Sequence, residues 1–264
     1  YYFISGSLML AWDRPSMKMF YKNISDNFSV FTYNTVGKFL EKFKLYPSAE
    51  TLYRKAVTAT NHGEIFYYKM GDLALKNKEF DLTVDCYRKV LESNPLNREV
   101  LIKLATVLQT YFPENTDETI DCYEKLLEFQ IDVPQIYYEL GHLYLKKEDK
   151  INSISAFKLA VEQDSENPFY NNSLAYAYSK AELYDDAIEH YQKAISLNPD
   201  KEWTSIVCQA LGSIYSEVKG NFEAAISTYQ AGIILDENNY ELYLALGDVY
   251  MAACDLDSAI RAYC

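Results

Sequence analysis

The amino-acid sequence predicts an all-α protein built from repeated helical hairpins. The chain has 264 residues, of which 49% are hydrophobic, and it contains only 9 glycines and 7 prolines. A chain that is half apolar and poor in helix breakers favours helices and can bury a sizeable core. The third observation is a pattern of small and aromatic residues that recurs about every 34 residues, as in stacked repeats.

The pattern is clearest in residues 170–199, which read YNNSLAYAYSKAELYDDAIEHYQKAISLNP. Its anchors are Leu174, Ala175, Tyr178, Ala187, Tyr191, Ala194 and Pro199. The same offsets recur in copies that begin near residues 30, 64, 98, 134, 168, 205 and 240, the last copy being truncated. We therefore predict one array over residues 30–264, preceded by a degenerate N-terminal helical segment over residues 1–29.

Each copy is predicted to contain two helices of about 12 to 14 residues, because the apolar pattern has a helical period on both sides of a short polar turn. Such turns read KNKEFD (76–81), KKEDKIN (146–152) and KAELYD (180–185). Extra residues at 109–118 and 200–204 predict two irregular turns.

Small residues at fixed positions explain how the two helices pack. The residue after the anchor leucine, such as Gly141 or Ala175, lets the second helix approach closely, and a small residue that opens the second helix, such as Ala187, lies opposite it. An aromatic residue four positions later, such as Tyr191, fills the wider part of the crossing. A large side chain at Ala187 would separate the helices, at a cost of about 1–3 kcal/mol.

These residues and their period resemble the tetratricopeptide repeat (TPR) family. The resemblance implies a right-handed superhelical solenoid of about seven TPR helix-turn-helix hairpins, with a concave groove that binds a partner peptide or helix. The chain departs from the family pattern in two ways. The usual tryptophan of the first helix is missing, and the proline that ends a hairpin survives only as Pro95 and Pro199.

In the family, the fifth and ninth residues of each copy face the groove. The resemblance therefore implies a partner-binding set of Tyr138, His142, Asn172, Tyr176, Asn34, Lys38, Tyr68 and Asp72. We expect its centre in the fourth and fifth copies, where large amphipathic side chains are densest. Some family members grip a carboxylate through Lys and Asn at these positions, but Tyr68 and Asp72 do not continue that pattern.

The thirteenth residue is lysine in four copies, namely Lys42, Lys76, Lys146 and Lys180. Favourable placement of a cation near the C-terminal end of a helix explains this regularity. The alternative is a row of cations along the groove edge that pairs with acids of a peptide.

The sequence predicts a non-catalytic scaffold for protein–protein interactions, with no cofactor and no metal. His62, His142 and His190 belong to different copies, and none has a second ligand at metal-binding spacing. A net charge of −13 argues against nucleic acids and anionic membranes as partners. The alternative is a substrate-recruiting arm of a larger enzyme, such as a glycosyltransferase, or of a membrane-anchored protein.

Cysteine usage and the chain ends give three further expectations. The five cysteines lack metal-site spacing, which favours reduced, buried thiols and a cytoplasmic compartment. The apolar stretch YYFISGSLMLAW is shorter than the roughly 20 residues that span a bilayer, so the array is not expected to insert into a membrane, although an anchor outside the fragment would fit. The incomplete last copy leaves Leu246, Val249 and Tyr250 partly uncapped, which predicts self-association through this end.

Overall fold

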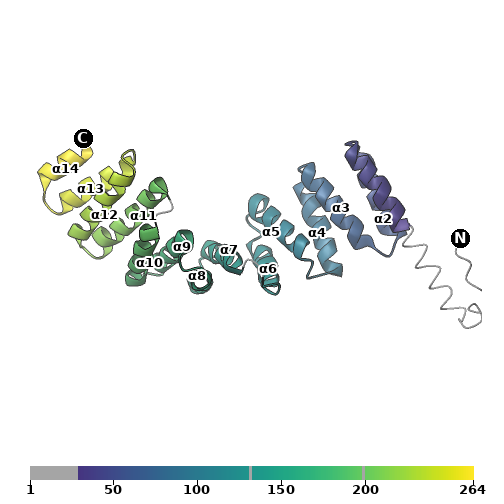
Figure 1. Cartoon of the computed structure of the whole chain (residues 1–264), viewed down its shortest axis with the longest axis horizontal. Helices are drawn as coiled ribbons and strands as arrows, with labels where there is room; N and C mark the ends of the chain where they lie inside the picture. The colour runs from purple at the N-terminus through teal and green to yellow at the C-terminus, as the bar shows by residue number, and fades with distance from the viewer. Residues whose placement is uncertain (1–28, 131–132, 198–199) are drawn as a thin grey trace, which may run out of the picture. The chain divides into compact units, whose positions relative to one another are not determined.

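The computed structural model describes residues 29–130, 133–197 and 200–264, and all regular secondary structure in these ranges is helical (Figure 1). The prediction of an all-α chain is thereby confirmed. Two predicted features lie outside the described residues, namely the N-terminal segment apart from residue 29 and the anchor residue Pro199.

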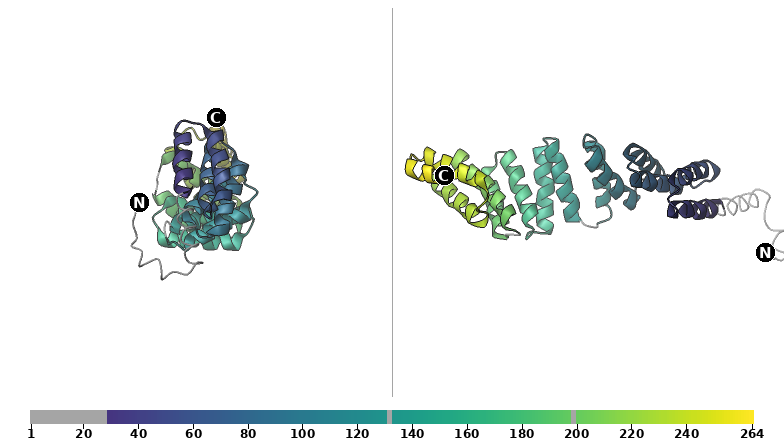
Figure 2. Two further views of the ribbon diagram at one scale, coloured as in Figure 1. Left: turned by 90° about the vertical axis from the view of Figure 1, so that its right-hand side faces the viewer. Right: turned by 90° about the horizontal axis from the view of Figure 1, so that it is seen from above.

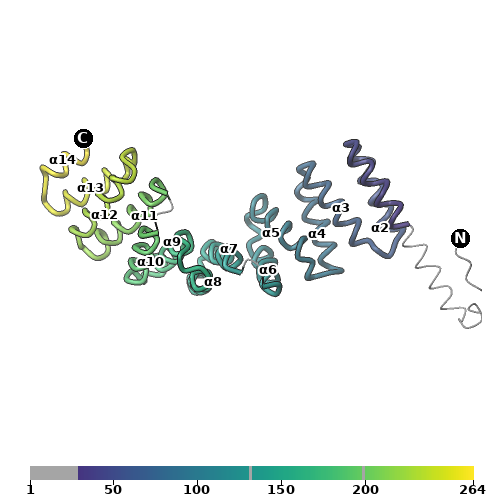
Figure 3. The backbone as a smooth tube through the Cα atoms, viewed as in Figure 1, coloured from purple at the N-terminus to yellow at the C-terminus, as the bar shows by residue number. Residues whose placement is uncertain are grey.

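The helices form antiparallel hairpins whose order follows the predicted copies (Figure 3). A helix over residues 29–42 pairs with α2 (Tyr46–Ala59). The next hairpins are α3 (Gly63–Lys76) with α4 (Phe80–Ser93), α5 (Arg98–Tyr111) with α6 (Thr116–Leu127), and α7 (Val133–Lys146) with α8 (Lys150–Gln163). They are followed by α9 (Pro168–Lys180) with α10 (Tyr184–Leu197), α11 (Lys201–Ser213) with α12 (Phe222–Leu235), and α13 (Tyr240–Ala252) with α14 (Leu256–Tyr263).

The chain divides into two compact units near the end of α6. Unit 1 extends to Leu126 and unit 2 begins at Leu127. Within unit 2, each helix packs on the next one along the chain, as the stacked hairpins in Figure 2 show. We call the exposed side of α7, α9, α11 and α13 the first-helix face, and that of α8, α10, α12 and α14 the second-helix face.

In five hairpins of the described part of the chain, the close approach of the two helices depends on a glycine covered by an aromatic ring. A methyl group on Gly141 would lie 2.6 Å from the ring of Phe157, and one on Gly212 would lie 2.3 Å from the ring of Tyr229. The small residue of the second helix also lies opposite the glycine, because the Ser153 hydroxyl donates to the Gly141 carbonyl over 2.9 Å. Both features of the predicted packing are therefore present.

The anchor residues of the fifth copy are buried in the same way. Ala187 and Ala194 are fully buried, and Tyr178 and Tyr191 are 5% and 2% exposed. These side chains form one core cluster with Phe157 of the preceding hairpin. The core of unit 2 is therefore continuous from one copy to the next.

A residue in the left-handed conformation reverses the chain in most hairpins. In three of them this residue is Lys78, Glu148 or Glu182, with φ between 59° and 63°. The next amide donates back to the last turn of the first helix, as from Asp149 to the Tyr144 carbonyl over 2.9 Å. This bond, which is typical of a Schellman cap, ends the first helix at the predicted polar turn.

The two predicted irregular turns differ from the structure. In the third copy the turn covers only residues 112–115, because helices extend through 109–111 and 116–118. In the sixth copy residues 201–204 are helical, since the Asp200 side chain accepts from the Trp203 amide and starts α11 there. The extra residues therefore lengthen α11 at its start. A π-helix, η2 (Ile214–Val218), follows α11 and accommodates one further residue, since Tyr229 comes seventeen rather than sixteen positions after Gly212.

The expectation of buried thiols is only partly met. Cys86, Cys122 and Cys208 are buried, whereas Cys254 and Cys264 are exposed. Cys254 has a positive φ of 62° in the turn after α13, which holds it at the surface. None of the helices in the described part of the chain combines the length and the apolar character that crossing a membrane requires.

The expected exposure at the C-terminal end is wrong for two of its three residues. Leu246 and Val249 are 6% and 5% exposed because α14 packs over α13. The apolar side chains that α14 itself leaves exposed are Leu256, Ile260 and Tyr263.

Candidate functional site

The densest group of predicted binding residues lies on the first-helix face of unit 2. Tyr138 and His142 lie one turn apart on α7, and Asn172 and Tyr176 lie one turn apart on α9. The two helices are neighbours, because the His142 Nε2 atom is 3.3 Å from the Ser173 hydroxyl. We call these four residues the α7–α9 wall.

Aromatic packing holds the α7 half of the wall in place. The Tyr138 and His142 rings are 4.6 Å apart, edge to face, and the His142 ring is 5.0 Å from buried Phe157. On its other side the Tyr138 ring is 5.1 Å from that of Tyr170 on α9. The rings are thus fixed before any ligand arrives, which lowers the entropy cost of binding.

Three polar groups of the wall are available to a ligand. Among the described residues, no hydrogen-bond partner is found for the Tyr138 hydroxyl, the Asn172 amide or the Tyr176 hydroxyl. Tyr176 is 45% exposed, and the Lys180 ammonium lies 5.1 Å from its ring centre. The wall therefore combines apolar area with donors and acceptors, as peptide-binding surfaces do.

A buried amide lies directly beneath the α9 half of the wall. The Asn171 side chain, 1% exposed, donates to the carbonyls of Ser165 and Asn167, each over 2.9 Å. Its oxygen therefore faces the Nδ1 atom of His190 at 3.1 Å, so that this nitrogen carries the proton. Through this contact His190 supports the first turn of α9.

Both histidines near the wall make stability depend on pH. Partial burial lowers the pKa of His142 and of His190, with smaller opposing effects from neighbouring acids. Between these lowered values and the ordinary value of about 6.5, the unfolded chain binds more protons than the folded chain. We expect the free energy of unfolding to fall as pH drops from about 7.5 to about 5.5 in urea titrations. In the variant His142→Gln/His190→Gln the fall should be smaller, and an equal fall in both proteins would contradict this assignment.

The predicted binding residues of unit 1 are engaged within the array. On α3, the Asp72 carboxylate lies 2.8 Å from the Lys103 ammonium of α5, which also contacts the Tyr68 hydroxyl at 2.6 Å and Glu99 at 3.1 Å. Tyr68 also donates to Glu99. Burial lowers the pKa of Lys103, but these hydrogen bonds outweigh it and raise the pKa overall. Tyr68 and Asp72 are thus less available to a ligand than the wall.

Asn34 and Lys38 lie on the helix over residues 29–42, one turn apart. The Asn34 carbonyl oxygen is buried without a hydrogen-bond partner among the described residues, whereas the Lys38 side chain is exposed. Within unit 1, neither residue shares a recorded hydrogen bond with Tyr68 or Asp72.

Framework tyrosines of the second helices reach polar residues of the first helices. Their hydroxyls donate from Tyr53 to Glu41 over 2.6 Å, from Tyr87 to Asp72 over 2.7 Å, from Tyr123 to Gln109 over 2.9 Å and from Tyr263 to Asp248 over 2.6 Å. Burial and the hydrogen bond to Asp72 raise the pKa of Tyr87. In the fourth copy Phe157 stands in this place, so His142 receives no such bond.

Sequence reasoning missed Lys103 and Glu99, because it considered only the fifth and ninth residues of each copy. A signal was present, since lysine occupies the sixth position of two successive copies as Lys69 and Lys103.

The lysines at the thirteenth position lie in the last turns of their helices, as Lys76 and Lys180 show, which agrees with the helix-end explanation. No cluster of three His, Cys, Asp or Glu side chains suited to a metal occurs in the described ranges.

Comparison with curated proteins gives relatives that share part of their sequence with this chain. Human protein O-mannosyl-transferase TMTC1 is 25% identical over 193 residues, which are 71% of this chain and 21% of that protein. The chain spans between 19% and 34% of the lengths of the curated relatives that it matches.

Solved structures show the same fold. The crystal structure of MamA has a TM-score of 0.58 and 25% identity, covering 67% of this chain and 94% of that chain. YrrB, described as a TPR protein with an unusual peptide-binding site, has a TM-score of 0.57 and 18% identity over 77% of this chain and 98% of that chain. Sequence models described as tetratricopeptide repeat match residues 66–95, 134–167, 171–201 and 218–264. With hairpins in the predicted order and aromatic rings over their glycines, the chain belongs to the tetratricopeptide repeat family.

Proposed function

We propose that the chain is a non-catalytic scaffold whose α7–α9 wall binds an extended segment of a partner protein. The observation that carries this proposal is the contrast between the two units. Tyr68 and Asp72 are held by Lys103 and Glu99, whereas the polar groups of Tyr138, Asn172 and Tyr176 lack partners among the described residues.

The chemistry of the wall suggests what kind of segment it binds. The Asn172 amide offers a donor and an acceptor to a peptide backbone, and the two tyrosines offer flat apolar area with a polar tip. The wall itself carries no acid or ammonium group, so contact specificity depends on hydrogen bonds and shape. The net charge of −13 steers basic rather than acidic partners toward the chain.

The test uses a displayed library of random peptides selected against the whole chain, followed by calorimetry of the selected peptides. Tyr138→Ala/Tyr176→Ala should weaken binding by about 2 kcal/mol or more, the scale of interface hot spots. Because neither side chain is fully buried, the helical circular dichroism signal should persist. The control is Tyr111→Ala, at a tyrosine of unit 1 that is 48% exposed. Equal affinities of both variants, with the fold intact, would exclude the wall.

A second candidate is that the array recruits protein substrates for a larger enzyme. The similarity to O-mannosyl-transferase TMTC1, of which the chain matches 21%, favours this alternative. In the full-length protein that contains this chain, mannosyl transfer to a protein acceptor should then be measurable, and Tyr138→Ala/Tyr176→Ala should raise KM for the acceptor. Absence of transfer by the full-length protein would reject this candidate.

A further inference from the structure

The charge of the thirteenth position is reversed in the sixth copy. This position is lysine in four copies, Thr110 in the third and Ala252 in the seventh, and the sixth copy alone carries an acid, Glu217. Glu217 lies in η2, the π-helix that follows α11. The C-terminal end of a helix carries partial negative charge, so an acid at this end lowers stability. Local rules of this kind are broken mainly at functional sites, where π-helices are also frequent.

A second acid lies across a pocket from Glu217. The pocket has a volume of about 310 Å³ and is formed by η2, α12 and α13 of unit 2, with Glu217 and Asp248 in its lining. The buried side chains of Tyr229 and Val249 line it as well. This volume is at the lower limit of pockets that hold small ligands, so the pocket suits a single side chain.

Both carboxylates act on one buried hydroxyl. Tyr229 is 2% exposed, and burial raises the pKa of its hydroxyl. The negative charges of Glu217 and Asp248 raise this pKa further, whereas a hydrogen bond with Ser216 opposes the increase. The two carboxylates therefore lie close enough together to act on the same ligand.

No cation of the chain neutralises these two acids. The Lys219 ammonium, two residues after Glu217, lies 2.6 Å from Asp185 instead. Asp248 accepts a hydrogen bond from the neutral Tyr263 hydroxyl over 2.6 Å, and neither acid forms an ion pair with another described residue. In the second copy, by contrast, the acid at the same position as Asp248 is paired with Lys103 over 2.8 Å.

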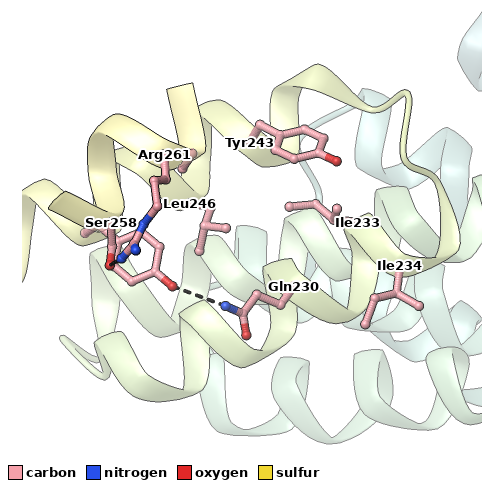
Figure 4. A pocket seen from close by; sticks show the side chains of 9 residues that line it. Gln230, Ile233, Ile234, Tyr243, Leu246, Ser258 and Arg261 are labelled. Carbon is pink, nitrogen blue, oxygen red and sulfur yellow. Dashed lines mark hydrogen bonds between the residues drawn. The ribbon is translucent and has the colours of Figure 1, made fainter. Parts of the chain in front are cut away.

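A pocket on the second-helix face has the opposite charge. It has a volume of about 520 Å³ and lies between α12 and α14, where Arg261 and Ser258 line it together with Leu246 and other uncharged residues (Figure 4). No acid lines this pocket. Of these two pockets, only the one with Glu217 and Asp248 favours a cation.

We propose that the pocket between η2 and α13 binds the arginine or lysine side chain of a partner protein. The inference rests on the proposed function, because the basic residue belongs to the extended segment that the α7–α9 wall holds. Its charged group supplies the cation that lysine provides at the thirteenth position of four other copies. Its aliphatic stem packs against Tyr229 and Val249, while the charged group bonds to Glu217 and Asp248.

The selected peptides of the displayed library test this proposal. Peptides selected against the whole chain should share an arginine or lysine. Replacing this residue by citrulline, which keeps the shape of arginine without its charge, should weaken binding about tenfold, because hydrogen bonds between charged groups are strong. In Glu217→Gln/Asp248→Asn the basic peptide and the citrulline peptide should bind equally. The asparagine keeps an oxygen that accepts from the Tyr263 hydroxyl, and circular dichroism checks the fold.

The matched control is Glu223→Gln/Glu237→Gln, which removes two exposed acids of unit 2 that lie outside the pocket. This control should keep the tenfold difference between the two peptides. Glu217→Gln alone changes one exposed side chain at a helix end, so it should leave the fold unchanged and reduce the difference.

The outcomes separate the pocket from the wall. Selected peptides without a shared basic residue, or a tenfold difference that survives in Glu217→Gln/Asp248→Asn, would overturn the pocket and leave the wall intact. Peptides whose affinity depends on Glu217 and Asp248 but is unchanged in Tyr138→Ala/Tyr176→Ala would support the pocket and exclude the wall. A library that yields no binding peptide would overturn both.

Discussion

Replacing Ala187 by tryptophan should lower the free energy of unfolding by about 3 kcal/mol, at the upper end of the usual cost of overpacking. Ala187 is fully buried at the start of α10, in one cluster with Leu174, Ala175 and Tyr191. A tryptophan here has no space unless α9 and α10 separate. That separation would also expose the side chains that the next hairpin covers, because the core of unit 2 is continuous.

Urea titration followed by circular dichroism measures this effect. The control is Ala252→Trp, at an exposed alanine in the last turn of α13, where an indole can extend into solvent. Its free energy of unfolding should change by less than about 1 kcal/mol. Similar losses in both variants would mean that the assigned repeat register is wrong.

Replacing Phe157 by alanine should lower the free energy of unfolding by about 3–5 kcal/mol. The ring is fully buried and lies over Gly141, so Phe157→Ala leaves a cavity where the glycine cannot fill the space. The same ring supports Tyr138 and His142 at centroid distances of 5.9 and 5.0 Å. We therefore expect loss of stability together with weaker peptide binding at the α7–α9 wall.

Phe169→Ala is the matched control for this second variant. Phe169 also lies in unit 2, but it is 44% exposed and contacts the Trp203 ring at 5.0 Å. Phe169→Ala should lower the free energy of unfolding by less than half as much as Phe157→Ala, as measured in thermal and urea melts. If the two phenylalanines proved equivalent, the claim that aromatic rings over glycines hold the hairpins together would fail.

The fold was predictable from sequence because its determinants recur. The pairing of a glycine with an aromatic residue sixteen positions later, as in Gly71 and Tyr87 or Gly141 and Phe157, is visible at several places in the chain. Each copy therefore confirms the interpretation of the others. Helix starts were also readable in principle, since Asp200 is a good N-cap that the repeat register obscured.

The site was less predictable, because its contacts join residues from different copies. Lys103 meets Asp72 across 31 positions, and Ser173 meets His142 across 31 positions, and the sequence does not show which of these side chains are hydrogen-bonded. A polar group of the groove can bind a ligand only if it is not already hydrogen-bonded within the protein. That distinction between Asp72 and Asn172 requires coordinates, because both residues occupy groove positions in the family numbering.

The tyrosine hydroxyls that cross the hairpins restrict how binding specificity could be redesigned. Exchanging Asp72 for an apolar residue would leave the buried hydroxyl of Tyr87 without its acceptor and Lys103 without its counter-ion. In the fourth copy the aromatic residue is Phe157, which has no hydroxyl. Exchanging His142 would therefore leave no buried tyrosine hydroxyl without an acceptor. Binding specificity could therefore be transferred from one copy to another only if two residues were exchanged together. These are the ninth residue of the first helix and the aromatic residue of the second helix that contacts it.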